Sequence, residues 1–101
     1  MTRYVVYTKE KGKIETDKGD DLRGLTFHRL GGPAYQVFYD NRQIQYTSYY
    51  INGKRHRLDG PAYQYFGKSG KLNYESYFIN DKEYTKSEYE TEIFKMKLSL
   101  L

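Results

Sequence analysis

The chain contains no cysteine and no tryptophan, and only two of its 101 residues are proline. Without cysteine it can form neither a disulfide framework nor a thiolate metal site, which argues against a small secreted domain. No stretch reaches the roughly 18 consecutive apolar residues of a membrane-spanning helix, and the first residues lack the apolar run of a signal peptide. We therefore expect a cytoplasmic protein with no membrane partner.

Tyrosine supplies 13 residues, against five phenylalanines, while 38% of the chain is apolar. A tyrosine can bury its ring while its hydroxyl reaches water, so this composition suits a thin structure with few fully enclosed positions. The length allows one domain over residues 1–101, with a small core. The composition favours a sheet with solvent-exposed edges over an enzyme with a large buried core.

Residues 28–55 and 56–83 are two copies of one unit, with 15 identical positions in 28 and no gap. A period of this length indicates that one supersecondary unit was duplicated and stacked. Residues 1–27 resemble a degenerate first hairpin followed by a charged loop, and residues 84–101 have a different rhythm. The chain therefore divides into four segments with these boundaries.

Each copy has the pattern of a β-hairpin. In the first copy, residues 34–39 and 43–51 are rich in aromatic and β-branched side chains, and a turn-forming segment at 40–42 separates them. The simplest register places three pairs opposite one another: Tyr39 and Ile44, Val37 and Tyr46, and Tyr35 and Ser48. In both copies this register gathers apolar side chains on one tyrosine-rich face, which includes Tyr46 and Tyr74, and we expect that face to be buried.

Residues 84–101 predict a helix of about 14 residues. Thr85 and Glu88 have the spacing of a capping box, and Tyr89, Ile93 and Met96 recur at helical intervals. Such a helix could cover the open end or the buried face of the sheet. The predicted fold is mostly β (α+β): an antiparallel meander of about three β-hairpin repeats with a C-terminal capping helix.

The joint between hairpins carries the same motif twice, His-Arg-Leu-x-Gly-Pro-Ala at 28–34 and 56–62. Proline suits the first residue of a strand, and glycine permits the tight bend before it. We expect Leu30 and Leu58 to fill the space between hairpins. His28 and His56 lie a whole hairpin apart, so each is expected to hydrogen-bond across its own turn rather than to share a metal ion.

These two strings, with Tyr-Tyr-Ile-Asn-Gly-Lys at 49–54, resemble the MORN-like hairpin repeats of bacteriophage, bacterial and giant-virus proteins. Residues 79–89 also resemble the terminus of such small viral proteins. The resemblance implies a meander of hairpins used as a binding scaffold, without a catalytic centre, as in a phage accessory protein that binds one host factor. The usual MORN unit has a glycine-tryptophan core and a shorter period, so its membrane-lipid role is not carried over.

No catalytic, cofactor or metal site is predicted. Asp17, Asp20 and Asp21 could supply carboxylates, but a glycine-bearing loop gives adjacent residues no fixed geometry. The sequence also lacks a nucleophile motif and a glycine-rich phosphate loop before a helix. Small ligands and catalysis remain the less favoured readings.

A protein partner and a nucleic acid are the two main alternatives. The net charge is +4, and residues 28–55 carry four basic side chains against Asp40. Aromatic side chains interleaved with Arg and Lys can stack bases and neutralise phosphates. However, Glu75 and Glu83 interrupt the basic track in the second copy, which favours a host protein, for example an immune nuclease complex that the chain inhibits or redirects.

The predicted contact surface lies on the more polar face of the hairpins, where aromatic and basic side chains mix as they do in protein interfaces. Exposed outer strands also make a homodimer by edge pairing a prediction. The predicted partner-binding residues are Phe38, Arg42, Tyr49, Lys54, Arg55, Phe66 and Tyr77.

Overall fold

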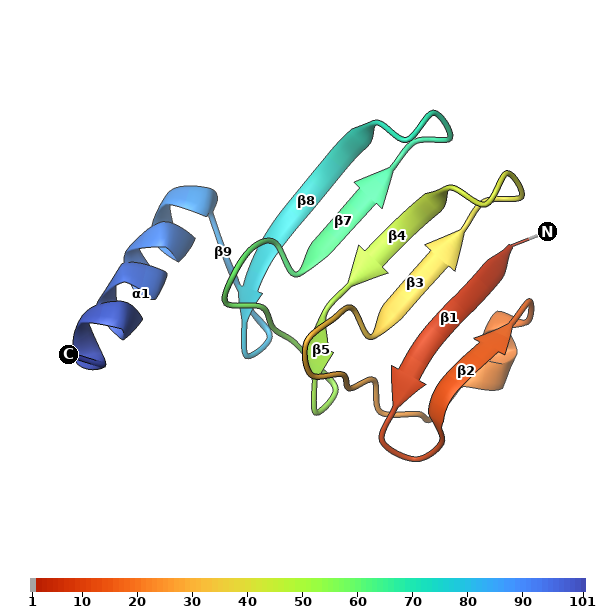
Figure 1. Ribbon diagram of the computed structural model, residues 1–101, viewed down its shortest axis with the longest axis horizontal. Coiled ribbons are helices and arrows are strands. Elements are labelled where there is room, and N and C mark those ends of the chain that lie inside the picture. The colour runs from red at the N-terminus through yellow and green to blue at the C-terminus, as the bar shows by residue number, and fades with distance from the viewer. Residues whose placement is uncertain (1) are drawn as a thin grey trace.

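A single layer of antiparallel strands forms the body of the molecule in the computed structural model, which describes residues 2–101 (Figure 1). The elements are β1 (Arg3–Thr8), β2 (Gly12–Thr16), the short 3-10 helix η1 (Gly19–Leu22), β3 (Tyr35–Phe38), β4 (Ile44–Ser48), β5 (Tyr50–Ile51), β6 (Lys54–Arg55), β7 (Tyr63–Phe66), β8 (Leu72–Ile79), β9 (Lys82–Tyr84) and α1 (Lys86–Ser99). This confirms the predicted class: a mostly β domain built of antiparallel hairpins with one C-terminal helix.

The order of strands in the main sheet is β2-β1-β3-β4-β7-β8-β9. From β3 onward the sheet follows the chain, interrupted by the small β5–β6 hairpin, as a meander of hairpins predicts. The two strands of the first hairpin stand in reverse order in the sheet, because β1 rather than β2 pairs with β3. The chain must therefore return from β2 at the edge of the sheet through residues 17–34, which include η1.

The register inside each repeat follows the predicted alternation up to a β-bulge. Val37 lies opposite Tyr46, and Tyr35 lies opposite Ser48, as predicted. Beyond Val37 the register shifts, so Ile44 lies opposite Phe38 and not opposite Tyr39. The second copy shifts at the same place, where Leu72 pairs with Phe66. A bulge adds one unpaired residue to a strand, which a regular two-residue period cannot predict.

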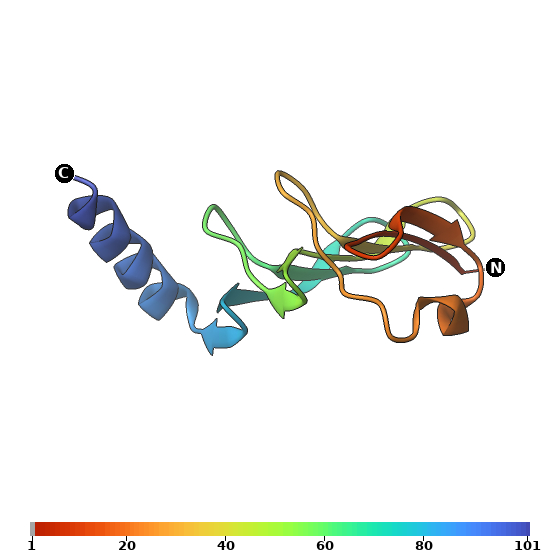
Figure 2. The ribbon, with the colours of Figure 1, turned by 90° about the horizontal axis from the view of Figure 1, so that it is seen from below.

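The two faces of the sheet are covered unequally. Figure 2 shows residues 17–27 crossing below one face near β1 and β3, while the loops at 28–34 and 56–62 rise above the other. The lower crossing covers the tyrosine-rich face: the ring of Phe27 contacts the rings of Tyr35 at 5.1 Å and Tyr50 at 5.4 Å between centroids. At this end of the sheet Val6 and Val37 are buried. One part of the core therefore lies under β1, β3 and β4, and a second part, with Phe78, Ile79 and Tyr89, lies where β8 meets α1.

The outer half of the tyrosine-rich face is open, so the prediction that this whole face is buried is wrong. Tyr74 is 55% exposed and Tyr46 is only half-buried. Tyr63 contacts Tyr46 at 5.8 Å and Tyr74 at 6.0 Å between ring centroids, so the rings pack mainly on one another. Burial among these rings raises the pKa of Tyr63 to about 12. The outer half of this face is open because α1 does not cross it.

Each joint is held by an arginine that lies over a tyrosine ring. The guanidinium carbon of Arg29 is 3.9 Å from the ring centroid of Tyr7. The equivalent distance from Arg57 to the Tyr49 ring is 4.0 Å. Both arginines also donate to a proline carbonyl four residues later, at 3.2 Å. The glycine of the motif leaves room for this arrangement, because a Cβ at position 32 would lie 2.8 Å from the guanidinium carbon of Arg29 and would displace that side chain.

The two histidines do hydrogen-bond within their own repeats. The Nδ1 atom of His28 accepts from the backbone N–H of Asn52 at 2.9 Å, and His56 accepts from Asn80 at 3.0 Å. The bond reaches the turn at the far end of the repeat, so it fixes the β5–β6 turn and its copy. The repeated histidines therefore have a structural function in both units.

The prediction that the repeated leucines fill the space between hairpins is wrong. Leu30 is 77% exposed and Leu58 is 46% exposed, at the tips of the two raised loops. The arginines described above occupy the space at each joint instead, because their side chains lie flat between a tyrosine ring and the glycine backbone. That arrangement leaves each leucine to point away from the sheet.

The helix α1 begins with the predicted capping box and then leaves the sheet. The Thr85 hydroxyl accepts from the Glu88 N–H at 3.2 Å, and the Glu88 carboxylate accepts from the Thr85 N–H at 2.9 Å. Its length of 14 residues agrees with the sequence. Figures 1 and 2 show that it extends beyond the edge formed by β8 and β9. No helix within residues 2–101 is long and apolar enough to cross a membrane.

Candidate interaction site

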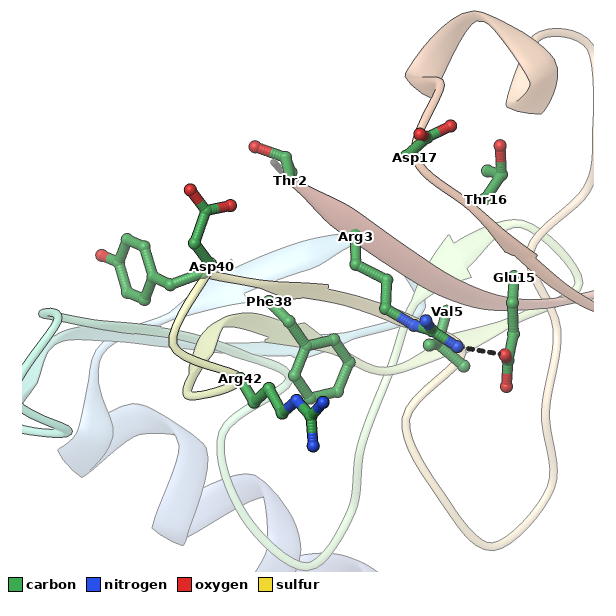
Figure 3. Close-up of a pocket in the computed structure, with 10 residues that line it drawn as sticks. Thr2, Arg3, Val5, Glu15, Thr16, Asp17, Phe38, Asp40 and Arg42 are labelled. Atoms are coloured by element: carbon green, nitrogen blue, oxygen red, sulfur yellow. Dashed lines mark hydrogen bonds and ion pairs between the residues drawn. The ribbon is translucent and has the colours of Figure 1, made fainter.

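Two of the predicted contact residues, Phe38 and Arg42, line the same open hollow at the end of the sheet where β1, β2 and β3 meet (Figure 3). Its volume is about 1020 Å³. Because Phe38 lies opposite Arg3 across β1 and β3, the hollow is on the face opposite to the tyrosine-rich one. The lining residues are Thr2, Arg3, Val5, Glu15, Thr16, Asp17, Phe38, Tyr39, Asp40 and Arg42.

The position of Arg42 is fixed by a tight turn between β3 and β4. Its backbone N–H donates to the carbonyl of Tyr39 at 2.9 Å, and the Tyr39 N–H donates to the Gln43 carbonyl at the same distance. The tip is also braced against the second repeat, because the Tyr39 hydroxyl donates to the Phe66 carbonyl at 2.7 Å. Figure 3 shows the Phe38 and Arg42 side chains directed into the hollow. The hairpin thus presents both groups from a rigid turn.

Arg42 has a backbone conformation that favours glycine. Its φ is +68°, and the equivalent residue of the second repeat is Gly70, with φ +89°. A non-glycine residue in this left-handed region costs on the order of 1 kcal/mol, and such strain concentrates at functional sites. The first repeat thus carries an exposed arginine where the same turn is less strained with glycine.

The charges around the hollow are mixed. Arg3 forms an ion pair with Glu15, whose other oxygen is 3.2 Å from Lys13 Nζ. The hydrogen bond from Lys13, together with the charges of Lys13 and Arg3, holds the pKa of Glu15 below its ordinary value. Asp17 and Asp40 also line the hollow. Figure 3 shows Glu15 on the same side of the strands as Phe38 and Arg42, whereas Asp17 and Asp40 point to the other side.

Tyr49 and Tyr77, two further predicted contact residues, are used inside the fold. Tyr49 lies under the guanidinium of Arg57 at the second joint. Tyr77 packs against Tyr89 of α1, with 4.8 Å between ring centroids, and its hydroxyl donates to Glu75. The structure therefore places both rings where repeats and helix are joined, away from the hollow.

Lys54 and Arg55 lie on β6, and the structure does not bring them to the hollow. Lys54 is exposed. Arg55 Nε donates to Asp81 Oδ1 at 2.9 Å, and its guanidinium lies over the Phe78 ring at 4.3 Å. Asp81 itself has a φ of +71°, at the position equivalent to Gly53. Arg55 thus holds the turn of the second repeat.

The contact between Arg55 and Asp81 predicts acid sensitivity. The hydrogen bond from the Arg55 side chain, followed by that from its backbone, holds the pKa of Asp81 below its ordinary value of 3.8. A lowered folded-state pKa stabilises the fold above 3.8, and this contribution is lost as the pH falls through the folded value. Urea unfolding of the Asp81→Asn variant should therefore depend less on pH below about pH 4 than that of the parent chain. Equal slopes would contradict this.

Phe66 occupies the position in the second repeat that Phe38 occupies in the first, but it lies outside the hollow. The other walls of the hollow come from β1, which pairs with β3, and from β2, which pairs with β1; neither strand pairs with β7, which carries Phe66. Sequence reasoning missed the residues Arg3, Val5 and Glu15 of these walls. The one available signal was the degenerate hairpin itself, whose alternation puts Arg3 and Val5 on the same face of β1.

Comparison of the chain with protein-family models, with curated proteins and with solved structures finds no match in any of the three. The resemblance to MORN-like repeats rests mainly on the motifs at 28–34 and 56–62. In the structure these motifs form the arginine and histidine joints, so they account for the stacking of hairpins. The hollow is formed by other residues and has to be interpreted from its own chemistry.

Proposed function

We propose that this protein is a non-catalytic binding module that recognises a partner protein through the hollow containing Phe38 and Arg42. The observation that carries the proposal is the left-handed Arg42, where the second repeat has Gly70. This arginine, exposed at the rim, does not serve the turn, which glycine would form with less strain. A contact with a partner gives it a function.

The chemistry of the hollow suits a protein side chain or loop. A half-buried phenylalanine beside an arginine is a typical anchor pair of protein interfaces, where aromatic residues and arginine are enriched among the positions that dominate binding. The turn that carries Arg42 is braced by hydrogen bonds to the neighbouring repeat, so little conformational entropy is lost on binding. These features favour specific contact with a folded surface.

A protein partner fits the charges better than a nucleic acid does. The lining of the hollow alternates the cations Arg3 and Arg42 with the carboxylates of Glu15, Asp17 and Asp40, so it offers a nucleic-acid strand no continuous basic track. A protein surface can match such a mixed pattern with charges of both signs. The nucleic-acid alternative depends on the excess of basic over acidic side chains in residues 28–55.

The sequence resemblance suggests where to look for the partner. MORN-like repeats in small bacteriophage proteins make a phage accessory protein the proposed context, with a host factor such as an immune nuclease complex as the first candidate to inhibit or redirect. Cytoplasmic localisation and membership of the MORN-like repeats belong to the same proposal. The family membership depends on the resemblance alone, and the localisation depends on the lack of cysteine and of an apolar N-terminal run.

Replacing Arg42 by glycine should separate binding from folding. The Arg42→Gly variant should be more stable by about 0.5 kcal/mol, since relief of the left-handed strain exceeds the added chain entropy of glycine. Its affinity for a protein captured by the parent chain should fall by about 10-fold or more. Urea unfolding measures the first effect, and titration against the captured protein measures the second.

The control is Arg42→Asn, which removes the charge but tolerates the left-handed conformation. It should lose affinity to a similar degree. Capture is carried out with and without nuclease, and at two salt concentrations, because nucleic-acid binding weakens steeply with salt through counterion release. Undiminished capture by both Arg42 variants, or capture lost on nuclease treatment, would refute the proposal.

A further inference from the structure

The outer edge of β8 is covered by β9 along only part of its length. β9 pairs with residues 77–79, and among the described residues no strand pairs with 72–76 on that side. The Ala62 N–H donates to the Ser76 carbonyl at 2.9 Å, so Ser76 directs its backbone groups toward β7. Since neighbouring residues of a strand direct these groups to opposite sides, the backbone N–H and carbonyl of Glu75 point to the open edge.

The first repeat shows what such an edge holds. Residues 46–48 of β4 are the copy of residues 74–76, and β7 fills their outer edge as an antiparallel strand. Thr47, the copy of Glu75, lies opposite Gln64 of β7 in that pair. The edge of β8 is therefore the repeat of an edge that holds a strand one unit earlier.

The two copies also differ in how far one tyrosine ring is covered. Tyr46 is half-buried, and its ring centroid lies 5.8 Å from that of Tyr63 and 5.1 Å from that of Tyr65, both on β7. Its copy Tyr74 contacts Tyr63 on the inner side at 6.0 Å and is 55% exposed. An added strand with aromatic residues at two alternate positions would cover Tyr74 as β7 covers Tyr46.

The helix α1 takes the place of a third unit without filling this edge. Its Tyr89 ring packs on Tyr77 with 4.8 Å between centroids, whereas at the preceding joint Arg57 lies over Tyr49. Figure 1 shows α1 beside the β9 end of β8, running away from the β7–β8 turn. The helix thus closes the third joint and leaves the edge near that turn open.

We propose that the open edge of β8 binds an extended segment of a partner protein, which adds to the sheet as an antiparallel strand. The segment carries aromatic residues at two alternate positions, which pack against Tyr74, and a basic or amide residue between them. This middle residue faces Glu75, whose carboxylate accepts from Gln64 at 3.1 Å and from Tyr77 at 3.2 Å. The site is independent of the proposed function, because β8 lies near the opposite edge of the sheet from the strands of the hollow.

A second copy of this chain fits the edge less well than a free segment does. In an antiparallel pair of two β8 strands, the β7–β8 turn of each copy would collide with β9 of the other, because β9 occupies the outer side at residues 77–79. In a parallel pair, the two β9 strands would collide. Pairing of β8 with the β2 edge of another copy would repeat without closing. A single extended segment meets none of these obstacles.

The test uses the full chain, isotope-labelled for NMR, and a synthetic peptide of residues 60–67, which contains β7 and is blocked at both ends. Because few backbone hydrogen bonds form, its dissociation constant should be about 1 mM. At about 5 mM peptide, hydrogen exchange of the Glu75 N–H should slow about fivefold. Exchange of the Tyr74 N–H, which faces β7, should not change. A Gln64→Lys peptide should bind about threefold more tightly and a Gln64→Glu peptide about threefold less tightly.

Two variants of the full chain separate the backbone contact from the side chain. Glu75→Pro removes the outward N–H and keeps the pairing with β7, so the fold should persist and peptide affinity should fall by about 10-fold or more. Glu75→Ala keeps the N–H, so it should bind the unchanged peptide within about threefold of the parent chain. It should also lose the preference for the Gln64→Lys peptide. The shift of the Tyr74 N–H resonance follows binding in both variants.

Three results would overturn the proposal. One is Glu75 exchange that does not slow at the highest peptide concentration, a measurement on the parent chain that decides the matter even if Glu75→Pro fails to fold. Another is slowed exchange on β2 instead of β8. The third is protection of the Glu75 N–H that grows with the concentration of the chain alone, which would show that a second copy occupies the edge.

Discussion

Replacing Tyr89 by alanine is expected to lower the free energy of unfolding by about 3 kcal/mol, the range for removing a large buried aromatic side chain. Tyr89 is 5% exposed, and it packs on Tyr77 with 4.8 Å between ring centroids. Its hydroxyl donates to the Arg57 carbonyl and accepts from the Gly60 N–H at 3.3 Å. Removal of this side chain undocks α1 and leaves two backbone groups of the second joint without their partner.

The measurement is thermal unfolding followed by circular dichroism, in which the melting temperature should fall by more than about 10 °C. Tyr89→Phe is the matched control: it keeps the ring and loses the hydroxyl's hydrogen bonds, so it should cost about 1 to 2 kcal/mol. The helical signal should be lost in Tyr89→Ala and kept in Tyr89→Phe. If Tyr89→Ala melted within a few degrees of the parent chain, the docking of α1 through this residue would be wrong.

Replacing Phe38 by alanine should weaken binding of the partner protein by about 30-fold, which corresponds to the roughly 2 kcal/mol of a central interface anchor. Phe38 lines the hollow together with Arg42 and is half-buried there, so its ring offers apolar area next to a charged group. Isothermal titration with the captured partner measures the loss. The circular dichroism spectrum of the variant should remain that of the folded chain.

The equivalent residue Phe66 provides a control for the fold. It has the same place in its strand and the same bulge beside it, so Phe66→Ala should disturb the sheet about as much as Phe38→Ala. It lies outside the hollow and should change affinity by less than about threefold, as do most residues away from an interface anchor. Equal losses for the two variants would instead support the wider surface over both repeats that the sequence predicts.

The hairpins and most of their register could be predicted because their causes are local. Alternation with a period of two appears in both copies, and a register shifted by one residue would scatter the apolar residues of each copy. The pairing of Val37 with Tyr46 follows from this pattern. The pairing of β1 with β3 does not, because it depends on how residues 17–34 cross the sheet and has no short-range signal.

The burial of the faces was harder to predict than their composition. Alternation shows that Tyr46 and Tyr74 share a face, but it does not show whether anything covers that face. Residues 17–27 cover only the end near β1 and β3, and α1 leaves the rest open. The exposed Leu30 has a similar explanation, since the arginine beside it fills the joint through a contact with an aromatic ring from another strand.

The candidate site could be predicted in part. Phe38 and Arg42 follow from the alternation and from the turn between the strands of the first repeat. The other wall, with Arg3, Val5 and Glu15, depends on the pairing of β1 with β3 and so could not be placed from the sequence. Alignment of the copies did contain one clue, since Arg42 falls on Gly70, a position where a turn favours glycine.

The joints make the sheet a structure that can grow by insertion. Each joint has the same three contacts. The arginine lies over a tyrosine ring of the preceding unit, and its bond to a proline carbonyl and the bond to the histidine acceptor lie within its own unit. A further 28-residue segment placed at position 56 would find matching neighbours on both sides and lengthen the molecule by one hairpin. The number of 28-residue units therefore determines the distance between the hollow and α1.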